Sequence, residues 1–175
     1  MSKTKKLTLL SMMVSMSLVL YRVEFFLPSL DFIAPGVKLG LPNIISISCL
    51  YIFGVKEAFA VLTVRSVISS MMFSGITAMM YSLVGGVLSL IFMWILKKVN
   101  FKSVSIIGVS MIGSFSFNIG QLTVASLILQ NFKVFYYLPY VSFMSMLTGI
   151  FVGLTAIFLI KAIKRVMKYE HVNTH

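Results

Sequence analysis

The chain has 175 residues, of which 59% are hydrophobic and only 11% are charged, and its mean hydropathy is +1.02. Soluble domains carry about 25% charged residues, so this composition excludes a soluble globule and favours an integral membrane protein. The net charge of +11 would suggest nucleic-acid binding in a soluble protein. In a membrane protein, however, Lys and Arg gather in cytoplasmic loops, and we expect no nucleic-acid partner.

Runs without charged residues predict the membrane spans. A spanning helix needs about 20 apolar residues at a rise of about 1.5 Å each. The run Ser66 to Leu96 is too long for one helix and breaks at Phe73-Ser74-Gly75. The sequence therefore predicts an all-α integral membrane protein, with a single six-helix domain over residues 1–168 and a short polar tail over 169–175. The six helices are expected at about residues 7–27, 41–55, 57–73, 76–96, 104–130 and 136–160.

The distribution of Lys and Arg predicts the orientation of these helices. We interpret the N-terminal segment as a retained first helix, because its apolar run continues into Arg22 and Glu24 without a cleavage site. With the N-terminus inside, the outer side carries only Lys38 and Lys133, which predicts a multi-pass protein of the cell membrane with both termini cytoplasmic. The inner side then holds Lys3, Lys5, Lys6, Lys56, Lys97, Lys98, Lys102, Lys161, Lys164, Arg165 and Lys168.

Polar residues inside the predicted spans indicate a binding site. The helix rise places five of them at a similar depth in the outer half of the bundle, with Arg65 beneath them near the midplane. Interhelical hydrogen bonding is the alternative for each residue, but the clustering of the set favours a cavity for a small molecule, open to the outside. We expect the connection 28–40 to lie over this cavity as a gate, with Lys38 near its mouth. The five outer residues are Glu24, Asn43, Tyr81, Asn118 and Gln121.

Arg65 needs an acceptor, because a buried guanidinium cannot lose its proton. Two interpretations stay open. Glu24 or Asp31 could pair with Arg65 permanently and make it structural. Otherwise a ligand carboxylate, phosphate or quinone-type oxygen would accept the hydrogen bonds of Arg65, with Asn118 and Gln121 orienting the rest of the ligand.

The sequence contains no pattern typical of catalysis. Asp31 is the only aspartate, the two histidines lie in the tail, and Cys49 has no nearby base. No phosphate-binding Gly-Lys-Ser/Thr loop occurs. We therefore expect no catalytic residues, no metal site and no cofactor, and any ATP hydrolysis would have to come from partner subunits.

Four sequence segments resemble a known membrane family. They are the stretch PGVKLGLPNI at 35–44, Val64-Arg65, YSLVGG at 81–86 and NIGQL at 118–122. In this order they are similar to the Gx transporter or heptaprenyl diphosphate synthase component I family, which resembles the substrate-binding S components of energy-coupling-factor (ECF) transporters. The resemblance implies six helices, both termini inside and an outward-facing pocket under the first loop. Pro42 and Phe117 depart from the family pattern, where a small residue and His are expected.

The resemblance also implies partners. An S component captures a small compound, here vitamin-like or related to isoprenoids or quinones, and joins a transmembrane coupling subunit and two ATPase subunits. The coupling subunit docks on small residues of the first helix, where Ser11 and Ser15 are the nearest match. The family label leaves an alternative role, as a non-catalytic membrane partner of a polyprenyl diphosphate synthase.

Overall fold

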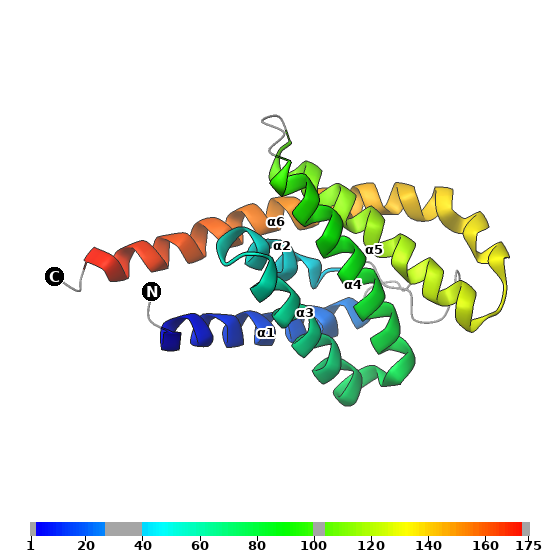
Figure 1. Cartoon of the computed structure of the whole chain (residues 1–175), viewed down its shortest axis with the longest axis horizontal. Coiled ribbons are helices and arrows are strands. Elements are labelled where there is room, and N and C mark those ends of the chain that lie inside the picture. The colour runs from blue at the N-terminus through cyan, green and yellow to red at the C-terminus, as the bar shows by residue number, and fades with distance from the viewer. Residues whose placement is uncertain (1–2, 27–39, 100–103, 173–175) are drawn as a thin grey trace.

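The computed structural model describes residues 3–26, 40–99 and 104–172, which fold into a bundle of helices (Figure 1). A π-helical turn, η1, joins two of the helices, and a short 3-10 helix, η2, precedes the last one. In chain order the elements are α1 (Lys3–Phe25), α2 (Asn43–Ile52), α3 (Val55–Ser69), η1 (Ser70–Ser74), α4 (Gly75–Lys98), α5 (Ile106–Ile128), η2 (Phe132–Tyr137) and α6 (Leu138–Val172).

The all-helical fold predicted from the sequence is confirmed, with six α-helices in the described residues. Within the described ranges, four segments are long and apolar enough to cross a membrane: 3–24, 75–98, 106–128 and 132–167. The helix expected at about 41–55 corresponds to α2, which has only 10 residues, or roughly 15 Å of helix, and is too short to cross a membrane on its own. The number of six membrane crossings therefore stays a prediction.

The apolar composition of α2 comes from burial inside the bundle. Every residue from Asn43 to Leu50 is buried, and α2 contacts α1, α3, α4 and α6. The helix begins directly after Pro42 and ends at Ile52, and Phe53 caps it before Gly54, which has a φ of 111°. A charge-free run in the sequence is equally typical of a lipid-facing span and of a buried core helix, which is why its length was overestimated.

The last helix extends beyond its predicted end at residue 160. α6 has 35 residues and reaches Val172, so helix continues into the segment expected to be a polar tail. Its length of roughly 50 Å exceeds the hydrocarbon thickness of about 30 Å. Lys161, Lys164 and Arg165 are exposed on the excess turns, as expected for helix that leaves the bilayer.

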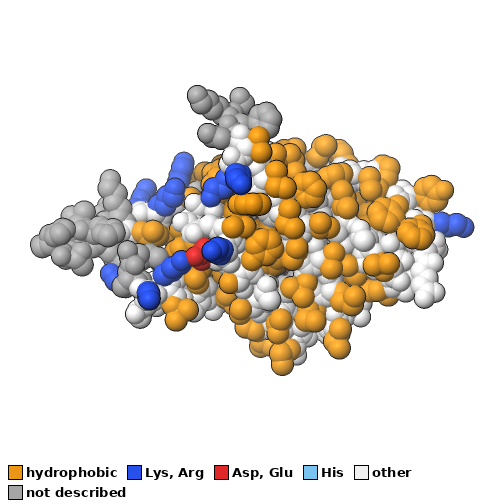
Figure 2. Space-filling view, viewed as in Figure 1, with side chains coloured by type: hydrophobic (Ala, Val, Ile, Leu, Met, Phe, Trp, Pro, Cys, Tyr) orange, Lys and Arg blue, Asp and Glu red, His pale blue; other side chains and the backbone are white. Residues whose placement is uncertain are grey.

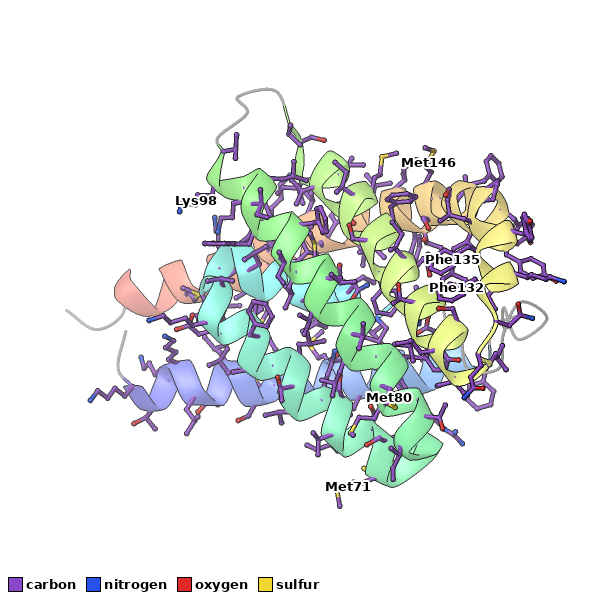
Figure 3. The ribbon with its side chains drawn as sticks, turned by 45° about the vertical axis from the view of Figure 1, so that its right-hand side comes forward. Met71, Met80, Lys98, Phe132, Phe135 and Met146 are labelled. Carbon is purple, nitrogen blue, oxygen red and sulfur yellow. The ribbon has the colours of Figure 1, made fainter. Side chains whose placement is uncertain are left out.

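The two ends of the bundle differ in charge. α1 begins and α6 ends at the same end of the molecule (Figure 1). Figure 2 shows most of the Lys and Arg side chains gathered at this end, whereas apolar side chains cover the middle of the same face. In Figure 3, Lys98 lies toward this basic end, and Phe132 and Phe135 lie at the opposite end. This separation of basic and apolar side chains matches the distribution of Lys and Arg from which the orientation of the helices was predicted.

Glycines allow α5 to approach both of its neighbours at backbone distance. A Cβ atom added to Gly120 would lie 2.7 Å from the Cα of Gly85 on α4. A Cβ atom added to Gly149 on α6 would lie 2.5 Å from the Cα of Met111 on α5. A Cβ atom added to Gly153, one turn further along α6, would lie 2.8 Å from the Cα of Ile107 on α5. Small residues spaced by four are a common way for membrane helices to pack closely.

Charged side chains from other helices stabilise the basic end of the bundle. The Nζ atom of Lys97, at the end of α4, donates a hydrogen bond to the carbonyl of Leu50 in the last turn of α2 (2.7 Å). This places a cation where the helix dipole of α2 is negative. Lys6 of α1 forms an ion pair with Glu57 of α3.

Candidate functional site

One cavity brings together side chains from α1, α3, α4 and α5 and the segment that enters α2. Four of the residues predicted from the sequence line it: Glu24, Arg65, Tyr81 and Gln121. Its volume is about 10 Å³, which is room for about one water molecule. A larger ligand can therefore enter only if the walls of the cavity separate. The remaining lining residues are Tyr21, Pro42, Ala78, Ser82 and Phe117.

Arg65 is the least satisfied polar residue of this cavity. It lies on α3 with only 3% of its surface exposed, and its Nε and Nη2 atoms are buried. Among the described residues, neither atom has a hydrogen-bond partner. A buried guanidinium keeps its proton, so an unmade hydrogen bond here is costly. Asp31, one of the two partners considered for Arg65, lies outside the described residues.

Glu24 has a different environment from the one expected of a ligand contact. Its side chain is buried at 6% exposure near the C-terminal end of α1. Its Oε1 atom accepts hydrogen bonds from the backbone N–H of Gly40 and from that of Leu41 (3.3 Å for the second). These N–H groups directly precede α2, so the carboxylate stabilises the positive end of that helix dipole. Glu24 therefore fixes the entry of the chain into α2.

We expect Glu24→Gln to lower the free energy of unfolding by about 1–2 kcal/mol, because the charge facing the start of α2 is lost. The measurement is thermal and denaturant unfolding of the purified protein in detergent. Glu57→Gln is the matched control, since it removes the same charge from the partly exposed ion pair with Lys6 and should cost less than about 1 kcal/mol. Equal losses in the two variants would contradict the role assigned to Glu24.

Tyr81 and Gln121 line the cavity, as predicted from the sequence. Tyr81 is 2% exposed on α4, and Gln121 is 1% exposed on α5. Beside them, the hydroxyl groups of Ser82 and Ser66 are 3.0 Å apart and join α4 to α3. The cavity therefore offers hydrogen-bonding side chains from two helices next to Arg65.

Asn118 and Asn43 are buried but do not line the cavity. The Nδ2 atom of Asn118 donates a hydrogen bond to the hydroxyl of Ser145 on α6 (2.6 Å), which is the interhelical bond that was the alternative interpretation. Asn43 is 3% exposed, and its side-chain amide has no hydrogen-bond partner among the described residues. Lys38, and with it the predicted gate, falls outside the described residues.

The apolar wall of the cavity contributes to the site and was not predicted from the sequence. Phe117 and Pro42 were noted only because they depart from the family pattern, and that departure was the available signal. The ring of Phe117 is packed so closely that a Cβ atom added at Gly40 or at Gly85 would approach it to 3.1 or 3.0 Å. Gly40 has a φ of 88°, which favours glycine at this turn.

Ser11 and Ser15, the residues predicted to bind a partner, are both exposed on α1. The hydroxyl of Ser15 donates to the backbone carbonyl of Ser11 at 3.1 Å. Because this bond is internal to the helix, the side chain of Ser15 lies close to the helix surface. The exposed face that they share is free of bulky groups at these two positions.

The helices and the small cavity beside the buried Arg65 define a helical membrane protein with a candidate binding site inside the bundle. The family described as heptaprenyl diphosphate synthase component I matches residues 13–159, and the chain belongs to this family. The resemblance seen in the four sequence segments is thereby confirmed. The family is a membrane component associated with heptaprenyl diphosphate synthase. No curated protein and no solved structure matches the chain at a significant level.

Proposed function

We propose that the chain is the substrate-binding subunit of an ECF-type importer in the cell membrane. It captures a small compound from outside, of a vitamin-like, isoprenoid-related or quinone-related kind, and it is not itself an enzyme. The observation that carries this proposal is the buried edge of Arg65, a lining residue of the cavity, whose Nε and Nη2 atoms lack a hydrogen-bond partner among the described residues. A ligand oxygen would supply the missing acceptor, and intramembrane ionisable residues commonly mark such sites.

The small volume of the cavity fits a binding subunit whose pocket closes when it is empty. Ligand entry requires the helices or the chain ahead of α2 to move, and ligand release would follow the same route. In this proposal a coupling subunit docks on α1, and two ATPase subunits provide the energy for release. These partners are expected because the chain lacks a phosphate-binding loop of its own.

Co-purification tests the proposal directly. The tagged protein, expressed in a host that carries a complete ECF module, should bring down a transmembrane coupling protein and two ATPases. The same protein should show a higher melting temperature with at least one compound from a vitamin and metabolite panel, because a ligand that binds only the folded state stabilises it. An unrelated six-helix membrane protein with the same tag is the control for both measurements.

The family description favours one alternative, a non-catalytic membrane partner of a polyprenyl diphosphate synthase. In that case the tagged protein would recover a soluble prenyl synthase and no ATPase. The tagged protein would also raise the membrane-bound fraction of that synthase. No compound of the metabolite panel would change the melting temperature of the tagged protein. This result would contradict the importer proposal.

A further inference from the structure

We propose that the cavity binds its ligand through a single carboxylate held by Arg65, and that the rest of the ligand is a compact apolar or aromatic body. This inference rests on the proposed function, because it takes the cavity to be a ligand site. It adds the chemical class of the group that is recognised. It also separates that class from diphosphates, the compounds to which the name of the family refers.

The first argument is the geometry of the two unpartnered atoms. Nε and Nη2 lie on the same edge of a guanidinium, and their N–H bonds point in nearly parallel directions. This edge matches the two oxygens of one carboxylate, which can accept both hydrogen bonds at once. In Arg65 both atoms of the edge are buried and without partners among the described residues. One carboxylate would therefore accept the hydrogen bonds of both atoms.

The second argument is the charge of the cavity. Its ionisable lining groups with fixed charge, within the described residues, are Arg65 and Glu24. The carboxylate of Glu24 already accepts hydrogen bonds from two backbone N–H groups at the positive end of α2. Arg65 and Glu24 carry one charge of each sign, so an anionic ligand would add buried negative charge beside Glu24, and a monoanion adds the least.

A phosphorylated ligand fits this charge balance less well. A phosphate monoester carries about 1.5–2 negative charges near neutral pH, and a diphosphate carries more. The surplus would be buried next to Glu24 without a second cation among the described lining residues. Burying an unpaired charge is far more costly than burying a neutral group.

The third argument is the composition of the remaining wall. Phe117, Pro42 and Ala78 present apolar surface, and Phe117 offers an aromatic face for stacking. Tyr81 and Gln121 can form hydrogen bonds with a polar atom on the body of the ligand. The wall therefore suits a ring or a short apolar chain with one or two polar substituents.

The experiment compares carboxylates with their own amides, which differ in charge but hardly in shape. The full chain in lipid nanodiscs is titrated with nicotinate and nicotinamide, indole-3-acetate and indole-3-acetamide, and benzoate and benzamide, with geranyl diphosphate as the phosphorylated probe. Saturation-transfer NMR gives affinities, and thermal unfolding gives an independent readout. We expect at least one carboxylate to bind at least about tenfold more tightly than its amide, as the loss of a charged hydrogen bond implies.

Two variants locate the effect. Arg65→Gln should remove the preference for the carboxylate, and Arg65→Lys, which keeps the charge but loses the two-pronged edge, should retain only part of it. Lys133→Gln removes an exposed positive charge from η2 and should leave the preference unchanged. If the Arg65 variants do not fold, the comparison of carboxylate with amide on the unaltered chain still shows whether the cavity prefers a carboxylate.

Three outcomes would overturn the inference: no carboxylate binds, each amide binds as tightly as its acid, or geranyl diphosphate binds more tightly than every acid. The proposed function fails on a separate observation, namely that no coupling protein or ATPase co-purifies. Suppose that each amide binds as tightly as its acid, or that the diphosphate binds most tightly, and that the ATPases are still recovered. The inference of a carboxylate ligand would then be wrong, and the proposed importer function would still hold.

Discussion

Gly149→Leu is expected to abolish the folded protein. The backbone of α6 at Gly149 lies against the backbone of α5 at Met111, and even a Cβ atom would come within 2.5 Å of the Met111 Cα. A leucine side chain can be accommodated only if the two helices separate along their contact. The cost should exceed the about 1–3 kcal/mol typical of an overpacked core, because the obstacle is backbone that cannot change rotamer. The measurement is the yield of monodisperse protein by size-exclusion chromatography in detergent.

Leu154→Phe is the matched control for this substitution. It also adds bulk to α6, but at a side chain that is 45% exposed on the apolar surface. Its yield and melting temperature should remain close to those of the unaltered protein, because a lipid-facing position has room for a larger apolar group. A normal yield of Gly149→Leu would show that α5 and α6 do not pack at this distance.

Replacing both Ser11 and Ser15 by Leu is expected to abolish ATP-dependent uptake and the recovery of the coupling subunit, while ligand binding is retained. Both serines are exposed on α1, and neither lines the cavity. Bulky side chains at two positions one turn apart would hold a partner helix away from the backbone of α1. Uptake of a labelled ligand into proteoliposomes, and the amount of co-purified ATPase, should each fall at least about tenfold, the effect of losing about 1.4 kcal/mol of docking energy.

Thr63→Leu provides the control on another exposed helix surface, because it adds similar bulk to α3. It should leave both uptake and co-purification intact. Loss of ligand binding in the double serine variant would show that this face of α1 supports the fold or the pocket. Unchanged co-purification would place the docking surface elsewhere.

Most of the fold could be predicted from the sequence, because charged residues are nearly excluded from helices that face lipid. The break at Phe73-Ser74-Gly75 was predicted in this way and coincides with η1 and the start of α4. The length of α2 could not be predicted, since burial in the bundle and exposure to lipid both favour the same apolar residues. The extension of α6 was missed because Lys161 and its basic neighbours were taken to end the helix, although charged residues are compatible with helix outside the bilayer.

The candidate site was predicted less completely, because depth along a helix does not determine which side a residue faces. Asn118 and Gln121 are three residues apart and differ by about 60° around α5. This difference is enough for Gln121 to line the cavity while Asn118 bonds to Ser145 on α6. The role of Glu24 was out of reach for another reason. Its partners are backbone N–H groups 16 and 17 residues away. Because almost every residue has such a group, the sequence does not show which of them a side chain contacts.

During biosynthesis, α2 cannot enter the bilayer as a span of its own, since insertion of an independent span requires about 20 apolar residues. The chain that enters α2 is held by Glu24, which is synthesised before it, and the last turn of α2 is stabilised by Lys97, which is synthesised well after it. Contacts with α6 come later still. The helix at the centre of the bundle therefore reaches its final position only after most of the chain has left the ribosome, and until then its polar ends depend on water or on the insertion machinery.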